Sequence, residues 1–168
     1  MVVWIIGLSG AGKTTLAKEI VKEVSKSKSV VLLDGDVVRD IFANDLGHSL
    51  DDRLTNAQRI CQLGKLLDDQ GVHVVCAILS LFPETRAWNR ENLKSYHEVY
   101  IDAPVCDLVS RDSKGIYSRY NKGEICDVAG MDLKFIPPES PDMIISNVGS
   151  KDKLLGYAKS ISEIIINE

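Results

Sequence analysis

The sequence predicts an α/β fold in which a mainly parallel sheet of five strands is covered by helices on both faces. Short runs that are largely apolar alternate along the chain with longer segments of helical periodicity. Strands buried on both faces belong to parallel sheets between two layers of helices, so the alternation indicates three layers. A length of 168 residues fits one domain with a substantial core, and we expect residues 1–168 to form a single domain.

Five apolar runs are the expected strands. The first two are VVWII at residues 2–6, bounded by glycine, and VVLLD at 30–34. The later three are VHVVCAIL at 72–79, EVYID at 98–102 and DMIIS at 142–146. Runs this short, apolar and rich in β-branched residues favour strands over helices.

Three segments show helical spacing. Residues 13–27 place apolar side chains on one face of a helix. These side chains are Leu16, Ile20, Val21 and Val24. Residues 53–71 form the second expected helix, in which Gly71 is the stop, and the third covers roughly residues 151–166.

The loop between the first strand and the first helix reads GLSGAGKTT, residues 7–15. It matches the Walker A pattern, in which glycines let backbone N–H groups turn toward phosphate oxygens and the next helix offers its positive end. Lys13 is expected to reach the β- and γ-phosphates of a nucleotide, and Thr14 to offer its hydroxyl to Mg²⁺. The expected phosphate-binding residues are Gly7, Ser9, Gly10, Ala11, Gly12, Lys13, Thr14 and Thr15.

A Walker A loop occurs in several classes of protein. A GTPase switch would usually carry an N-K-x-D motif after a late strand, but the nearest string, NKGE at 121–124, ends in glutamate and follows no expected strand. A nucleotide-binding module without catalysis would need no residues for a phosphoryl acceptor. Residues of that kind therefore separate a kinase from such a module.

Candidate acceptor residues follow the second strand, in LLDGDVVRD at 32–40. Ligands of open parallel sheets bind at the carboxyl ends of the strands, where Asp34 and Asp36 lie. Asp36 could orient an acceptor hydroxyl or take its proton, and either carboxylate could hold Mg²⁺ through water. Arg39 could bind an anionic acceptor. The competing interpretation is a turn followed by a helix cap.

Residues 113–141 form a long polar connection with several glycines and prolines. A connection of this length in a compact domain is often a lid over an active site. We expect the lid to cover roughly residues 113–135, and the alternative is a plain surface excursion.

Charge and composition argue against several kinds of partner. The formal net charge of −4 argues against a surface that coats nucleic acid, and no apolar run approaches the roughly 20 residues that span a bilayer. The first residues, MVVWIIGLSG, carry no basic leader or cleavage site, so we expect a cytoplasmic protein. No cysteine pair has metal-ligand spacing, which indicates reduced thiols. The cysteines are Cys61, Cys76, Cys106 and Cys126.

The motifs as a set resemble the adenylylsulfate kinase family along the whole chain. They are GLSGAGKTT, LDGDVVR, LGHSLDDRLTNAQR, AILSLFPETR, VYIDAPVCDLVSRDSKGIYSR and KGEICDVAGMD, in the order and spacing of that family. The resemblance implies a P-loop α/β sandwich with a mobile lid, often assembled as a homodimer. It further implies transfer of the γ-phosphoryl of ATP, with Mg²⁺, to the 3′-hydroxyl of a small nucleotide acceptor, adenosine 5′-phosphosulfate.

The resemblance also implies roles for single residues. Lys13, Asp36 and Lys114 are the implied catalytic residues, with Asp36 beside the 3′-hydroxyl and Lys114 a lid lysine close to the phosphates. Thr14 and Asp36 are the implied metal ligands, and Arg111 resembles the arginine that packs on the ATP adenine. The implied acceptor-binding residues are Asp34, Arg39, His48, Arg53, Asn56, Ser80 and Val128.

The sequence departs from the family pattern on the acceptor side. His48 stands in LGHS and Val128 in DVAG where the family has phenylalanines that sandwich the acceptor's adenine, and stacking is worth on the order of 1–3 kcal/mol per base. Val37 and Cys126 likewise replace an expected asparagine and lysine. Aromatic residues available to substitute are Phe42, Phe82, Trp88 and Tyr120.

Two acceptors therefore remain open. The family default is adenylylsulfate, bound with help from other side chains. The alternative is a nucleotide with a smaller base, such as cytidine diphosphoramidate, which an adenylylsulfate-kinase-like enzyme phosphorylates at the 3′ position in capsule biosynthesis.

Overall fold

The structure is a computed structural model that describes residues 1–168. Its five strands form one sheet in the order β2-β3-β1-β4-β5, and every pairing is parallel. The strands are β1 (Val2–Ile6), β2 (Val30–Asp34), β3 (His73–Ile78), β4 (Tyr96–Asp102) and β5 (Met143–Ser146). The predicted sheet is thus confirmed, with all of its strands within two residues of the expected bounds.

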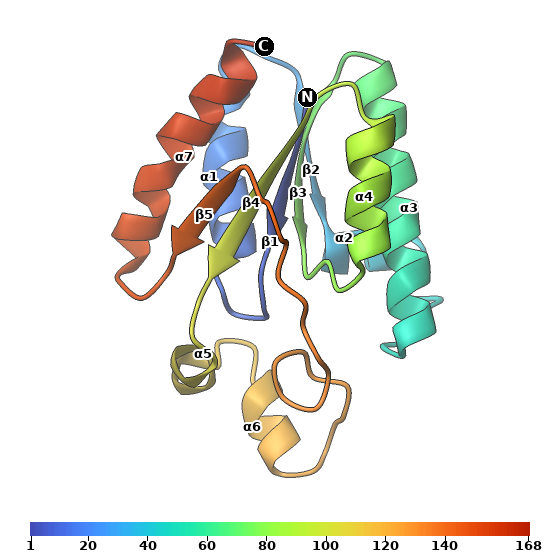
Figure 1. Cartoon of the computed structure of the whole chain (residues 1–168), viewed down its shortest axis with the longest axis vertical. Coiled ribbons are helices and arrows are strands. Elements are labelled where there is room, and N and C mark those ends of the chain that lie inside the picture. The colour runs from blue at the N-terminus through green and yellow to red at the C-terminus, as the bar shows by residue number, and fades with distance from the viewer.

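Helices cover both faces of the sheet and complete the predicted three layers (Figure 1). The first and last helices, α1 (Lys13–Val24) and α7 (Lys151–Ile166), pack side by side on one face. The other face is covered by α3 (Leu50–Asp69) and α4 (Pro83–Asn92). No helix is long and apolar enough to cross a membrane.

The core consists of two apolar clusters separated by the sheet. Side chains of β1 alternate between them, so that Val3 and Ile5 pack with α1 and α7 while Trp4 packs with Ile60 of α3. Every residue of β1 is buried. This explains why the central strand reads as an uninterrupted apolar run.

Helix α3 begins three residues earlier than the sequence predicted, because Ser49 caps it. The Ser49 hydroxyl accepts a hydrogen bond from Asp52 N at 3.2 Å. At the other end Gly71, with φ of 76°, follows the last turn as expected.

Four shorter helices were not predicted. They are α2 (Gly35–Ile41), α4, α5 (Val105–Arg111) and α6 (Ile116–Asn121). Three of them are too short to show a helical period, and α4, PETRAWNREN, is mostly polar. These helices form because of their terminal residues and their packing on the rest of the fold, and not because of an apolar stripe in their sequence.

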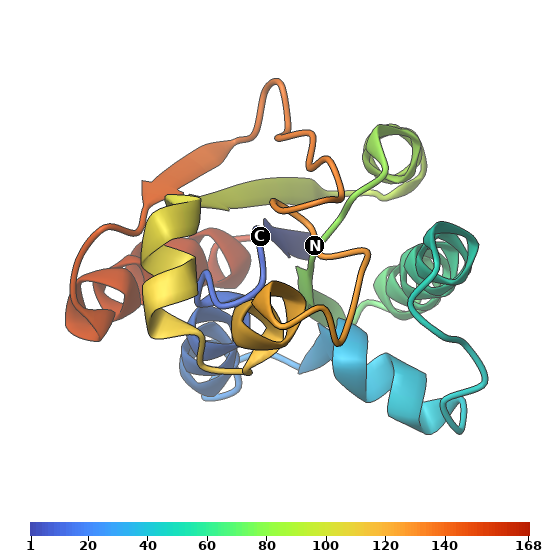
Figure 2. The same cartoon turned by 90° about the horizontal axis from the view of Figure 1, so that it is seen from below.

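The carboxyl ends of the strands point toward one end of the molecule, where α5, α6 and the connection to β5 lie below the sheet (Figure 1). Seen from that end, α6 lies in front of the central part of the sheet (Figure 2). Both chain termini lie at the opposite end (Figure 1). Any site at the strand ends is therefore covered by the segment that the sequence predicted as a lid.

Candidate active site

A cavity of about 900 Å³ opens between the strand ends and this covering segment. Its walls come from the Walker A loop, the start of α2, the first half of α3, the turn after β3 and residues around α6. The structure brings nearly all predicted site residues together here, and only Gly7, Ala11 and Arg111 lie outside the lining.

The Walker A loop adopts a backbone that requires glycine. Gly10 and Gly12 have φ of 76° and 98°, and a Cβ on Gly12 would collide with Leu154 of α7. Gly12 is the N-cap of α1 and no side chain caps that helix. The first N–H groups of α1 are therefore free for an anion, as phosphate binding requires.

Lys13 lies inside this loop. Its ammonium donates a hydrogen bond to the carbonyl oxygen of Leu8 at 2.8 Å. Burial and the nearby Lys114 lower the pKa of Lys13 to about 8, against the opposing charges of Asp34 and Asp36. A half-buried ammonium with one neutral partner gains from a phosphate placed beside it.

The Thr14 hydroxyl donates to Asp34 Oδ2 at 2.6 Å, while Asp34 Oδ1 accepts from the backbone N of Asp36 at 3.0 Å and caps α2. A hydroxyl beside a carboxylate suits Mg²⁺, which in proteins keeps several water or phosphate ligands. No group of three or more His, Cys, Asp or Glu side chains offers a complete cage. The residues present thus fit a metal that is shared with phosphates.

Asp36 forms an ion pair with Lys114 across the cavity, with Nζ and Oδ2 2.6 Å apart. Burial opposes ionisation of Asp36, but the hydrogen bond and charge of Lys114, followed by the charges of Lys13 and Arg39, hold its pKa below the ordinary value. Asp36 is therefore a carboxylate at neutral pH, better suited to orienting a hydroxyl than to removing its proton early.

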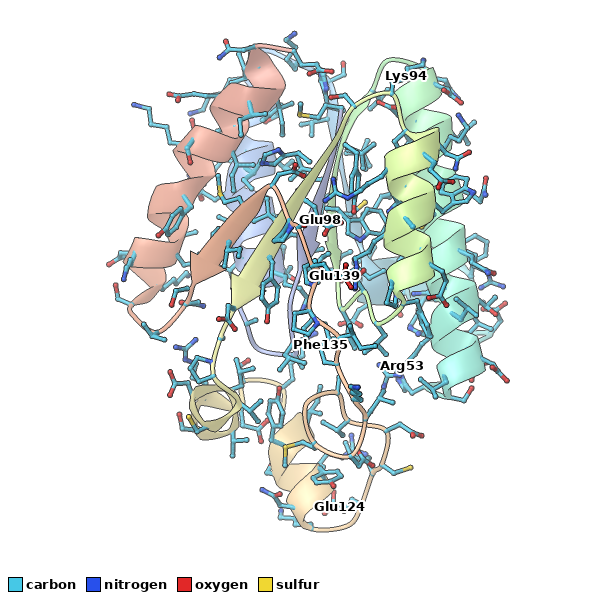
Figure 3. All side chains as sticks on the ribbon, viewed as in Figure 1. Arg53, Lys94, Glu98, Glu124, Phe135 and Glu139 are labelled. Atoms are coloured by element: carbon cyan, nitrogen blue, oxygen red, sulfur yellow. The ribbon has the colours of Figure 1, made fainter.

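The two predicted acceptor arginines bind backbone carbonyls around the cavity. Arg39 donates to Gly47 O at 2.7 Å, and Arg53 donates to His48 O at 2.8 Å and Asp127 O at 3.0 Å. Figure 3 shows Arg53 between α3 and the segment below the sheet. Arg53 thereby connects the α3 wall to the covering segment.

Among the predicted acceptor residues, Asn56 has a buried side-chain oxygen without a hydrogen-bond partner. It is 4% exposed, its Nδ2 donates weakly to Gly35 O at 3.4 Å, and its Oδ1 has no partner. A buried unpaired acceptor costs on the order of 1–3 kcal/mol, so a ligand donor here would bind favourably. Ser80, also buried, has φ of 53° and accepts from Trp4 Nε1 at 3.4 Å.

Three predicted residues have surroundings that the sequence did not suggest. His48 is exposed, and partial desolvation of its ring, followed by the charges of Arg39 and Arg53, lowers its pKa. Val128 is 5% exposed and belongs to the core. Arg111 donates to Asn147 O at 3.1 Å, away from the cavity.

The sequence analysis did not identify two residues whose hydrogen bonds organise the covering segment. Tyr117 is 1% exposed and its hydroxyl donates to Ser9 O of the Walker A loop at 3.0 Å. Asp132 accepts from the backbone N of Asp127 at 2.9 Å and of Val128 at 2.7 Å. Neither contact has a local sequence pattern that would have revealed it.

A Walker A loop at the end of a parallel sheet, facing acidic and basic acceptor groups in one cavity, defines a P-loop phosphotransferase. The sequence model of the adenylylsulphate kinase family matches residues 1–146. The chain belongs to the adenylylsulphate kinase family, and it is an ATP-using kinase with an alcohol group as acceptor. This excludes the module without catalysis.

Similar proteins include kinases for two acceptors. The chain is 37% identical over 150 residues to the cytidine diphosphoramidate kinase of Campylobacter jejuni, covering 87% of this chain and 85% of that one. It is 41% identical over 143 residues to the adenylyl-sulfate kinase of Deinococcus deserti, covering 84% and 79%. The Mycobacterium tuberculosis APS kinase CysC, solved with AMPPNP and APS, superimposes with a TM-score of 0.88 at 32% identity, over 98% of this chain and 96% of that one.

Proposed function

We propose that this kinase transfers the γ-phosphoryl of ATP to the 3′-hydroxyl of a nucleoside 5′-anhydride, by family default adenylylsulfate. The observation that carries this proposal is the shared cavity, in which Lys114 pairs with Asp36 and lies near Lys13 of the Walker A loop. Donor and acceptor groups thus face one another across the space that a transferring phosphoryl would cross. An ATP-dependent reaction is consistent with a cytoplasmic protein, and the family resemblance supports a homodimer.

The donor-side and catalytic residues have the following roles in this proposal. Lys13 and the free N–H groups of α1 would neutralise the donor phosphates. Arg111, outside the cavity lining but hydrogen-bonded to Asn147 next to the Walker A loop, would pack on the ATP adenine. Thr14 with Asp34 or Asp36 would hold Mg²⁺, which when bound neutralises charge on the phosphate oxygens. Asp36 orients the acceptor hydroxyl, while Lys114 exchanges its partner from Asp36 to the phosphoryl group.

The acceptor end of the cavity is polar and cationic. Arg39 and Arg53 offer charge to an anionic 5′-group, and the unpartnered Asn56 Oδ1 accepts from a ligand donor. These contacts suit the ribose and 5′-anhydride of a nucleotide and do not depend on its base.

A cytidine nucleotide is the second candidate acceptor. His48 is exposed and Val128 is buried in the core, so neither offers a large aromatic face to a base. A pyrimidine needs less stacking surface than adenine, and the similarity to a cytidine diphosphoramidate kinase supports this alternative.

Coupled ADP release with adenylylsulfate and with cytidine diphosphoramidate tests the proposal. We expect kcat/KM to be higher for adenylylsulfate. The reverse order would select the cytidine nucleotide as acceptor. Absence of turnover with both compounds would contradict a nucleotide 3′-kinase.

We further propose that the chain is a single domain in which residues 113–135 act as its lid. The lid touches the body through the Lys114–Asp36 pair, the Tyr117–Ser9 hydrogen bond and the Arg53–Asp127 hydrogen bond. Tyr117 and Val128 also anchor it in the core, so we expect opening to be a local motion of the residues around these anchors when ligands are absent.

Amide hydrogen exchange measures how often the lid opens. Amides in 113–135 should exchange faster in the ligand-free protein than with MgADP and acceptor bound, because bound ligand adds contacts to the lid. Amides of β1, which is wholly buried, should be equally protected in both states and serve as the internal control. Equal lid protection in both states would make this segment a fixed loop.

A further inference from the structure

Aromatic side chains are nearly absent from the cavity. Phe82 is the only Phe, Tyr or Trp among its lining residues, and His48 is the only other ring. The other candidates, Phe42, Trp88 and Tyr120, do not line the cavity. Phe42 instead lies under the guanidinium of Arg59, 4.5 Å from the ring centroid. Phe135, labelled in Figure 3, stacks on Tyr100 with ring centroids 6.1 Å apart.

Phe82 lies at the acceptor end of this cavity. It ends the turn between β3 and α4, directly after Ser80 and Leu81. The lining of the same cavity includes Asn56 and Ala57 of α3. Phe82 is half-buried, so part of its ring packs against the core while the rest faces the cavity.

The turn that carries Phe82 is held rigidly. Ser80 has a left-handed backbone, and the buried guanidinium of Arg86 donates to Ser80 O at 2.8 Å. The Phe82 carbonyl accepts from both the N–H and the hydroxyl of Thr85, at 3.2 and 2.8 Å. A ring on a backbone fixed at both sides loses little freedom when it binds a flat ligand.

From these observations we propose that Phe82 is an acceptor-binding residue that stacks against the base of the acceptor nucleotide. The inference rests on the proposed function, because it takes the ligand of this cavity to be a nucleotide. A partly exposed ring in one cavity with an unpaired amide oxygen and cationic side chains suits a ligand with a flat aromatic part and an anionic part. Because every base has a π-face, the ring accepts adenine or cytosine.

Calorimetric binding with saturating MgADP, which occupies the Walker A loop, tests the role of Phe82. The probes are adenosine 5′-monophosphate, cytidine 5′-monophosphate and ribose 5-phosphate, and the last has no base. Stacking should make the preferred nucleotide bind about 5- to 150-fold more tightly than ribose 5-phosphate. In Phe82→Leu, which keeps an apolar side chain, nucleotide affinity should fall by about fivefold or more while ribose 5-phosphate affinity is unchanged.

Two further variants separate stacking from packing. Phe82→Tyr keeps the ring and should bind like the wild type, and Phe42→Leu removes a ring outside the cavity and should also bind like it. Unchanged nucleotide affinity in Phe82→Leu, or an equal loss of affinity for all three probes, would contradict base stacking by Phe82 and leave the proposed function standing. A wild-type protein that binds none of the probes would overturn the proposed function together with it.

Discussion

Lys13→Ala is expected to remove phosphoryl transfer while leaving the fold intact. The half-buried ammonium of Lys13 is placed to neutralise the transferring phosphoryl, and loss of one such donor costs roughly 10²–10³-fold in kcat. The variant should not unfold, because its only lost hydrogen bond is to Leu8 O and a desolvated charge is removed with it. Turnover with MgATP and a thermal melt measure both effects.

Lys18→Ala is the matched control, since Lys18 lies on the same helix but is exposed. It should turn over like the wild type. Near-wild-type turnover in Lys13→Ala would refute the Walker A assignment.

The same ammonium gives the donor site a pH dependence. Lys13 carries its proton below its pKa of about 8, so wild-type affinity for MgADP should weaken as the pH rises past that value. Lys13→Ala should lack this dependence.

Asp36→Asn is expected to lower kcat by about 10²–10⁴-fold while ATP affinity changes little. The hydrogen bond of the Asp36 carboxylate is to Lys114 and not to the Walker A loop that would bind ATP. The amide keeps the shape of the side chain but removes the negative charge that would hold the acceptor hydroxyl. Single-turnover rates and the ATP dissociation constant separate the two effects.

Asp40→Asn, at an exposed position on the same helix, provides the control. A normal kcat in Asp36→Asn would transfer the orienting role to Asp34, which contacts Thr14. Weakened ATP binding with unchanged kcat would assign Asp36 to the donor side.

The sheet and the donor loop could be predicted from the sequence because each depends on local pattern. A buried parallel strand must be apolar along its length, so β1 and β3 appear directly in the sequence. The Walker A loop requires glycine at fixed spacing, and Gly10 and Gly12 indeed adopt positive φ. Short polar helices such as α4 have no equivalent pattern.

The acceptor end could be predicted only in part, because its geometry depends on contacts between distant segments. The sequence indicated Arg53 as an acceptor residue, but not its hydrogen bonds to His48 O and Asp127 O, which lie far apart in the chain. Val128, expected among the acceptor-binding residues, lines the cavity but is almost wholly buried in the core, so a larger side chain there would overpack the interior. The sequence offered Phe82 only as one of four aromatic residues that could replace the missing phenylalanines, and the fold shows that it is the one that lines the cavity.

The position of the new phosphate in the product tests the central claim most directly. After reaction with MgATP, phosphorus NMR of the product of whichever acceptor is turned over should locate one added phosphate on the ribose 3′-oxygen. The 3′-deoxy analogue of that acceptor should release no ADP, because it lacks the hydroxyl that Asp36 is proposed to orient. A phosphate at any other position, or equal ADP release with the 3′-deoxy analogue, would contradict the account.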